Sequence, residues 1–374
     1  MNGKDRFSRR QLLSLGAAAV LSPALRLYPA ASARLAGRGA WLSALCCLPP
    51  LLLYVWSFSL FTARRREGEG IAELTLRCLG DKPGRAVLLL YGLWFVLYAG
   101  FVLRASAERF MVALFPESAP AFFVLSLGLA VLLCSLGRPR SLLRLARMLL
   151  PVLLGVLGLL LLVSLQQVKA ENLLPLTERD TLPVLLGALP VAEVLLLGIY
   201  APGFLLGGVS GEEDSFRAAA GWLSGLCLLL TALCAAVLGC FGAELTARLS
   251  LPFFTLVRNL VFFRTVERIE ALVAALWLFP DFLLASLSLF CAGICLRLAL
   301  KKPSGRGEER LLSVENGRWL LWLSGAAAIA AGLLLAPNGD ALTLWSERIV
   351  PIGQAAAALL FPLIYMVGTA RKRL

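Results

Sequence analysis

Long apolar runs separated by short charged connections dominate this chain. A helix needs about 20 apolar residues to cross a bilayer, and ten runs approach or exceed that length. The predicted spans cover approximately residues 12–33, 40–61, 86–114, 119–136, 148–165, 182–208, 218–241, 271–298, 319–336 and 349–368. Little chain remains for a soluble domain, so residues 1–374 are predicted to form one integral membrane domain.

The basic residues predict how these helices are oriented. With a cytoplasmic N-terminus, 24 of the 36 Lys and Arg lie on the cytoplasmic side and nine lie outside. This bias predicts that both termini, residues 1–11 and 369–374, are cytoplasmic. The longest outside connection, about 244–270, is amphipathic and carries Phe253, Phe254, Phe262 and Phe263. It predicts a helix lying in the membrane interface, and a solvated loop with a hydrophobic patch is the alternative.

Composition supports a membrane protein and excludes several kinds of chemistry. Apolar residues make up 59% of the 374 and charged residues 16%, which is far from the balance of a soluble domain. There is no histidine, which excludes histidine zinc sites and Ser-His-Asp triads. The net charge of +13 comes from short basic clusters between apolar runs, which favours contact with anionic lipid over nucleic acid.

The nine cysteines lie mainly inside apolar runs and form no C-x-x-C motif. We interpret them as small core hydrophobes rather than metal or redox groups. The sequence therefore predicts a protein that is not an enzyme and has no metal or cofactor.

The first run has two interpretations. "FSRRQLLSLGAAAVLSPALRLYPAASA", residues 7–33, combines a twin-arginine pair, an apolar stretch and a small-residue A-S-A, as an export signal does. It can equally be the first membrane helix. Cleavage would remove the helix that pairs with the sixth run, so we expect the segment to be retained.

Proline and glycine interrupt the first and sixth runs at comparable places. The first contains Ser22-Pro23 and Pro29, and the sixth contains Pro190, Gly198, Pro202 and Gly203. Proline removes a backbone donor and clashes with the preceding turn. In a chain of ten spans, this pair suggests two five-helix halves and a transporter-type site between two broken helices. Ordinary packing kinks are the alternative, and Pro49 and Pro50 in the second run show that proline is not confined to the pair.

Four ionisable residues lie deep in the predicted spans: Arg26, Arg104, Glu193 and Asp281. Each would cost about 2.5 to 3.5 kcal/mol facing lipid, so they should face the interior and pair. Glu108 lies one helical turn after Arg104 and predicts a local i,i+4 pair.

The four charges have a functional and a structural interpretation. In the first, they orient a zwitterionic solute such as an amino acid. Exposed backbone amides of a broken first helix bind the carboxylate of the solute, and Glu193 lies near its ammonium group. In the second, Arg26 and Arg104 only neutralise Glu193 and Asp281 in a ligand-free core. The candidate binding residues are Ser22, Pro23, Arg26, Arg104, Glu193, Gly198, Tyr200 and Asp281, with Pro29, Pro190 and Pro202 as helix breaks.

Several segments resemble the B-subunit permeases of bacterial spore-germination receptors, a branch of the amino acid, polyamine and organocation transporter superfamily. They are "SRRQLLSL", "LYPAASARLAGRGAWLS", "CLGDKPGRAVLLLY", "LGALPVAEVLLL" and "FFRTVERIEALVAALWLFPDF". In the last of these, Glu267, Arg268, Glu270 and Trp277 are similar to the family pattern E-R-x-[DE]-A-L-x-x-x-x-W. The family's first helix usually contains a glycine at its break, where this chain has Ser22-Pro23 and Arg26.

The resemblance implies an all-α, polytopic membrane fold of ten transmembrane helices, a 5+5 inverted repeat of transporter type with broken helices 1 and 6. It also implies a receptor subunit in the inner spore membrane that binds a small nutrient germinant, commonly an amino acid. Partner A-type and C-type subunits would complete the receptor. One alternative is an active permease driven by an ion gradient, with Glu193 or Asp281 carrying a proton, and another is a structural subunit whose site has decayed.

Overall fold

The chain folds almost entirely into α-helices. The computed structural model describes residues 7–66, 68–113, 115, 117–209, 215–259, 269–300 and 318–370. The α-helices are α1 (Arg9–Ala36), α2 (Ser43–Cys46), α3 (Leu48–Ala63), α4 (Ile71–Leu79), α5 (Asp81–Ala113), α6 (Pro120–Ser135), α7 (Pro139–Ser164), α8 (Thr181–Gly187), α9 (Leu189–Gly203), α10 (Ser215–Arg248), α11 (Pro252–Asn259), α12 (Ile269–Leu300), α13 (Arg318–Leu334), α14 (Gly339–Leu344) and α15 (Val350–Ala370). Short 3-10 turns and one π-helical turn, η7 (Trp345–Ile349), connect some of them.

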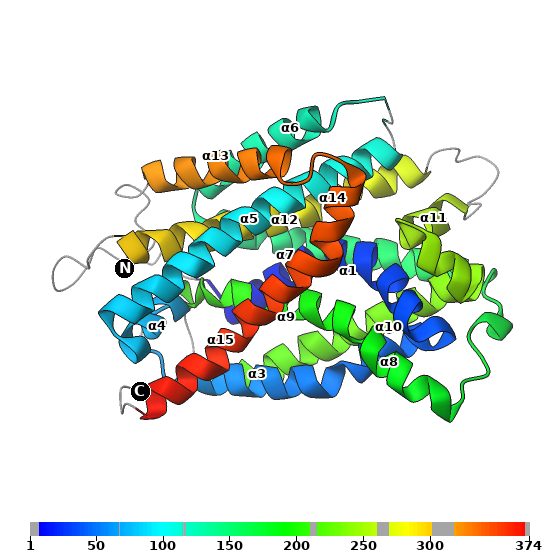
Figure 1. Ribbon diagram of the computed structural model, residues 1–374, viewed down its shortest axis with the longest axis horizontal. Helices are drawn as coiled ribbons and strands as arrows, with labels where there is room; N and C mark the ends of the chain where they lie inside the picture. The colour runs from blue at the N-terminus through cyan, green and yellow to red at the C-terminus, as the bar shows by residue number, and fades with distance from the viewer. Residues whose placement is uncertain are drawn as a thin grey trace.

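The helices form a layered bundle in which distant parts of the chain lie side by side. Helices α5 and α12 run alongside each other, with α6 and α13 next to them (Figure 1). Helix α1 is surrounded by α7, α8, α9, α10 and α12, and most of its side chains are buried. The first predicted span therefore lies at the centre of the fold.

The predicted spans are largely helical, and the second and sixth are each divided between two α-helices. Among the described residues, seven stretches are long and apolar enough to cross a membrane: Arg9–Ala63, Asp81–Val112, Pro139–Ser164, Glu178–Gly203, Phe216–Arg248, Leu276–Leu300 and Gly339–Ala370. Pro120–Ser135 and Trp319–Leu334 are shorter apolar helices, and the first stretch contains both α1 and α3. An all-helical, multi-pass membrane fold is thus confirmed, while the count of ten crossings stays a prediction.

A capping box starts α1 earlier than the apolar run predicts. Ser8 accepts a hydrogen bond from the backbone N–H of Gln11, and the Gln11 side chain accepts one from the Ser8 N–H. This reciprocal pair satisfies two of the N–H groups that a helix start leaves free. The helix begins at Arg9 and runs through the A-S-A segment without a break, while retention of this helix stays a prediction.

The prediction that the first helix is broken is wrong. Helix α1 is continuous, with Pro23 and Pro29 inside it. A proline removes only its own N–H and deprives the carbonyl four residues earlier of its helical donor. Neighbouring helices let a membrane helix tolerate that loss, and α1 is packed on nearly all sides. The two prolines therefore leave the carbonyls of Ala19 and Leu25 without a helical donor. They do not expose the row of backbone amides that a broken helix would expose.

The sixth span is interrupted, but near its beginning. Ala188 separates α8 from α9, two residues before Pro190, which cannot donate to the carbonyl of Leu186. Pro202, by contrast, lies inside α9, one residue before the helix ends. The sixth span is thus divided at Ala188 and not around residues 198–203.

The segment predicted to lie outside the membrane contributes a short amphipathic helix, α11, to the bundle. Helix α11 buries Phe253, Leu256 and Val257 against its neighbours. The Phe253 ring packs 5.4 Å from the ring of Trp277, measured between centroids. Phe262 and Phe263 lie outside the described residues, so the predicted interfacial helix over the whole of 244–270 stays a prediction beyond α11.

Helices α1 and α9 approach closely because each places a glycine in the contact. A Cβ added to Gly198 would lie 2.9 Å from Cγ1 of Val20, and one added to Gly16 would lie 3.1 Å from Cγ of Pro202. Both distances are shorter than ordinary van der Waals contact. Gly198, predicted as a binding residue, is therefore part of the α1–α9 packing.

We expect Gly198→Val to destabilise the protein, because a larger side chain must separate α1 from α9. Overpacking of this kind lowers the free energy of unfolding by about 1 to 3 kcal/mol. The measurement is the thermal unfolding of the purified protein in detergent. Gly155→Val is the matched control, since a Cβ on Gly155 meets no atom within 4 Å. Equal unfolding temperatures for the two variants would contradict the tight α1–α9 contact.

Candidate functional site

A buried charged cluster joins α1, α5 and α12. The hydroxyl of Ser22 donates to Oδ1 of Asp281 at 2.6 Å. Nη1 of Arg109 donates to Oγ of Ser22 at 2.6 Å, and Nη2 of the same guanidinium pairs with Oδ2 of Asp281. All three residues are buried. Two predicted site residues, Ser22 and Asp281, are thus brought together by an arginine that sequence reasoning missed.

Arg104 does not belong to this cluster, so the predicted pairing of Arg104 with Glu193 or Asp281 is wrong. Its Nε donates to the carbonyl of Ala336 at 2.7 Å, and its Nη1 pairs with Glu108 at 2.7 Å. The local i,i+4 pair with Glu108 is confirmed. Arg109 follows Arg104 by five residues, about 140° around a helix of 3.6 residues per turn, and so it faces a different side of α5.

Arg26 and Glu193 are close to each other without direct contact. Nη1 of Arg26 donates to Oγ of Ser346 at 3.2 Å, and the guanidinium carbon lies 5.3 Å from the centroid of the Phe101 ring. Glu193 is 7% exposed and lies within electrostatic range of Arg26. Among the described residues, Glu193 has no hydrogen bond and no ion pair within 4.0 Å. Arg26 and Glu193 therefore influence each other electrostatically without forming an ion pair.

A third polar group comes from α15. The hydroxyl of Tyr200, a predicted site residue, donates to Oε1 of Gln354. Gln354 is 1% exposed, and its Nε2 has no partner in the part of the chain that the structure describes. A buried amide donor left free costs about 1 to 3 kcal/mol. Such a group is a natural contact for a bound solute.

The π-helical turn η7 places Ser346 toward Arg26. It precedes α15 and contains Ser346, whose side chain is buried. Such turns are rare and occur frequently at functional sites. No pattern in the sequence signals η7, and neither Ser346 nor Gln354 is charged, which is why a search for buried ionisable residues missed both.

Two spaces lie on either side of the cluster along α1. One is a mostly apolar cavity of about 80 Å³ between α1, α3, α9 and α10, bordered by residues such as Gly16, Val20, Phe58 and Pro202. The other is a small pocket next to Arg26 and Arg109, bordered by Phe253 and Trp277. The polar groups around Ser22 and Arg26 thus separate the two spaces.

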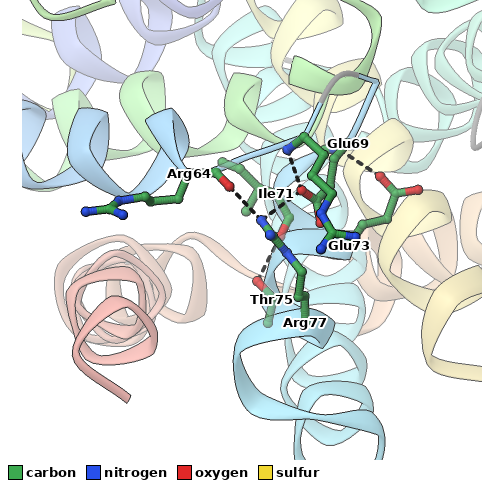
Figure 2. A network of polar contacts seen from close by, with 8 residues as sticks. Arg64, Glu69, Ile71, Glu73, Thr75 and Arg77 are labelled. Atoms are coloured by element: carbon green, nitrogen blue, oxygen red, sulfur yellow. Dashed lines mark hydrogen bonds and ion pairs between the residues drawn. The ribbon is translucent and has the colours of Figure 1, made fainter. Parts of the chain in front are cut away.

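A second polar network fixes the connection between α3 and α4 (Figure 2). Nη2 of Arg77 donates to the carbonyl of Arg64 at 2.6 Å and pairs with Glu69 at 3.0 Å. The Glu73 carboxylate accepts from the N–H of Gly70 at 2.7 Å and caps α4. These contacts join residues of α4 and of the connection between α3 and α4, and we interpret the network as structural.

Two further hydrogen bonds hold the chain after α9. Nη1 of Arg65, in the connection just described, donates to the carbonyl of Leu206 at 3.1 Å. The N–H of Phe7 donates to the carbonyl of Gly208 at 3.2 Å. The ends of α1, α3 and α9 are therefore tied together at one end of the bundle.

The remaining described residues that the sequence singles out lie within helices or in contacts between helices. Pro23 lies inside α1 next to Ser22. Trp277 is buried against α11, and Glu270 is in the first turn of α12. Glu267 and Arg268 lie outside the described residues. The nine cysteines are all free, and six of them are buried.

Opposite charges buried between the helices of a multi-pass bundle are typical of membrane transporters and permeases. One solved structure that matches is a Na⁺-coupled sialic acid symporter in a substrate-bound outward-open state, with a TM-score of 0.67 and 12% identity over 98% of this chain and 79% of that one. At this identity the match shows a shared fold. The search of curated proteins gave no match.

A family model described as "spore germination protein", the spore permease model, matches residues 6–338. The chain belongs to this family. It is a germination-related membrane permease, in agreement with the resemblance seen in its motifs.

Proposed function

We propose that this chain is a nutrient-germinant receptor subunit of the inner spore membrane, with both termini on the spore-core side. It binds a small zwitterionic solute, an amino acid, and passes a conformational signal to A-type and C-type partner subunits. The observation that carries the proposal is the buried Glu193 carboxylate, which has no direct partner in the described part of the chain although Arg26 is within electrostatic range.

The groups around this position suit the two ends of an amino acid. The guanidinium of Arg26 matches a carboxylate in charge and planar geometry, and the free Nε2 of Gln354 is a further donor. Glu193 matches the ammonium, as does the carbonyl of Ala19, which Pro23 deprives of its helical donor. The proposed carboxylate site is therefore a side-chain site, in place of the helix amides that the sequence predicted.

Binding would signal only if the solute prefers one packing of the helices over another. Arg26 is on α1, Glu193 on α9 and Gln354 on α15, so a solute between them contacts three helices at once. The close glycine contact between α1 and α9 makes their relative position sensitive to small changes.

The test is the germination response of spores that carry Glu193→Gln at normal protein level. A hydrogen bond to a charged group contributes about 1.5 to 3 kcal/mol, so the amino acid concentration for half-maximal response should rise roughly 10- to 150-fold. The readout is the fall in optical density across a panel of common L-amino acids. Glu108→Gln is the matched control, because Glu108 pairs with Arg104 away from the cluster.

The result can also contradict the proposal. An unchanged concentration-response in Glu193→Gln, combined with loss of germination when the whole protein is absent, would support a structural subunit with a decayed site.

An active secondary transporter of amino acids or related solutes is the second candidate. It is favoured by the fold shared with a Na⁺-coupled symporter and by the buried Glu193, a carboxylate that can take up a proton. Uptake by proteoliposomes that depends on an ion gradient and is lost in Glu193→Gln would support it.

A further inference from the structure

An apolar groove runs between α7 and α10, away from the charged cluster. Leu150 and Leu154 of α7 form one wall, and Gly221, Gly225 and Leu229 of α10 are among the residues of the other. A Cβ added to either glycine would meet no atom within 4 Å. No described part of the chain covers this strip, which we call the α7–α10 groove.

The groove lies on the lipid-facing side of a membrane protein. Neighbouring side chains of the two helices are large, apolar and exposed: Val152 is 51% exposed, Leu159 53% and Leu228 58%. In a membrane-spanning bundle, such a surface contacts acyl chains. The groove is therefore filled by lipid or by another apolar segment.

One end of the groove is basic. Arg217 borders it where α10 begins, and Arg147 precedes Leu150 by one turn of α7. Arg144 lies one further turn toward the start of α7, and both α7 arginines are exposed. Helix α7 contains no acidic residue. Arginine suits a phosphate because its planar fork forms paired hydrogen bonds.

The length of the groove suits acyl chains. From Arg217 to Leu229 an α-helix rises about 18 Å at 1.5 Å per residue. One leaflet of the hydrocarbon core of a bilayer is about 15 Å thick, so the groove can hold acyl chains along most of their length.

We propose that the α7–α10 groove is a binding site for an anionic phospholipid. Its acyl chains lie along Gly221 and Gly225, and its phosphate is bound by Arg144 and Arg147 at the end where α7 and α10 begin. Basic clusters at the ends of membrane helices attract anionic lipids, and here the open strip between the helices adds a place for the chains.

The bound lipid would contact the wall of an interior cavity. Trp222 and Leu226 border both the α7–α10 groove and the cavity of about 80 Å³ next to α1 and α9. Lipid in the groove would therefore restrict Trp222, whose position affects the space beside the α1–α9 contact.

Native mass spectrometry of the full chain in detergent tests the site, with phosphatidylglycerol and phosphatidylcholine of identical acyl chains as probes. We expect phosphatidylglycerol to bind at least tenfold more tightly than phosphatidylcholine. Arg144→Gln with Arg147→Gln should remove this preference. Gly225→Leu should fill the groove and lower the binding of both lipids.

The controls use equivalent positions elsewhere. Arg85→Gln removes an arginine that pairs with Asp81 on α5, and Gly155→Leu adds a side chain to an open face of α7 that does not border the groove. Both should leave lipid binding unchanged, and thermal unfolding checks that every variant is folded. The proposal is overturned if the two lipids bind equally, or if the groove variants bind lipid like the controls. It is also overturned if Gly225→Leu disrupts a stable complex with another protein chain while lipid binding is unaffected.

Discussion

Replacing Asp281 by alanine is expected to cause the largest loss of stability of any single substitution described for this protein. It leaves the guanidinium of Arg109 buried without its counter-charge and removes the acceptor of the Ser22 hydroxyl. Breaking a buried ion pair by removing one partner costs about 3 to 5 kcal/mol. The measurement is the thermal unfolding of the purified protein, together with the yield of monodisperse protein after extraction.

A double variant separates the role of the charge pair from simple loss of packing. Asp281→Leu with Arg109→Leu removes both charges, and replacing a whole buried pair by apolar residues is often neutral. It should therefore unfold at a higher temperature than Asp281→Ala. Asp81→Ala is the matched control, since Asp81 forms an exposed pair with Arg85 and such pairs contribute about 0 to 1 kcal/mol. If the double variant is no more stable than the single one, the cluster is not the ion pair described.

Replacing Arg26 by glutamine is expected to weaken the response to amino acids strongly while the protein stays folded. Arg26 contributes a hydrogen bond to Ser346 and a contact with the Phe101 ring, but no ion pair to any described residue. Its loss therefore costs little stability, whereas the proposed carboxylate contact disappears. We expect at least a 100-fold increase in the half-maximal concentration. The readout is germination of spores that contain matched amounts of variant and wild-type protein.

Two further variants make the result specific. Arg26→Lys keeps the charge but lacks the planar fork, so its response should be intermediate. Arg104→Gln removes a buried arginine outside the cluster, whose partners are Ala336 and Glu108, and should leave the concentration-response unchanged at equal protein level. A stronger effect of Arg104→Gln than of Arg26→Gln would contradict the proposed site. It would show that the response depends on buried charge in general and not on a contact between Arg26 and the solute.

Much of the fold can be predicted from the sequence because hydrophobic length and burial act locally. Each apolar run is largely helical, although the second and sixth runs are each divided between two α-helices, and the Arg104–Glu108 pair follows from helical spacing alone. The continuity of α1 is not predictable in this way. Proline weakens a helix locally, but whether the helix breaks depends on what surrounds it, and α1 is surrounded by helices from distant parts of the chain.

The candidate site shows the same limit. Arg26, Glu193 and Asp281 were predicted because a charge within an apolar run is conspicuous. Arg109 lies near the end of its run, where a charge can reach water, so nothing in the sequence distinguishes it from an interfacial residue. Gln354 is uncharged, and its importance depends on Tyr200, 154 positions earlier in the chain.

The π-helical turn η7 also determines which residues of the last helix can act together. Over the eight residues from Ser346 to Gln354, a regular α-helix would rotate these side chains to positions about 80° apart. A π-helical turn contains one more residue than an α-helical turn, and this extra residue reduces the angle between the two side chains to about 20°. Arg26 and Tyr200 can then both keep their partners on the same helix. A single backbone hydrogen-bond register in η7 thus decides whether α15 presents one polar face to the site or two separate ones.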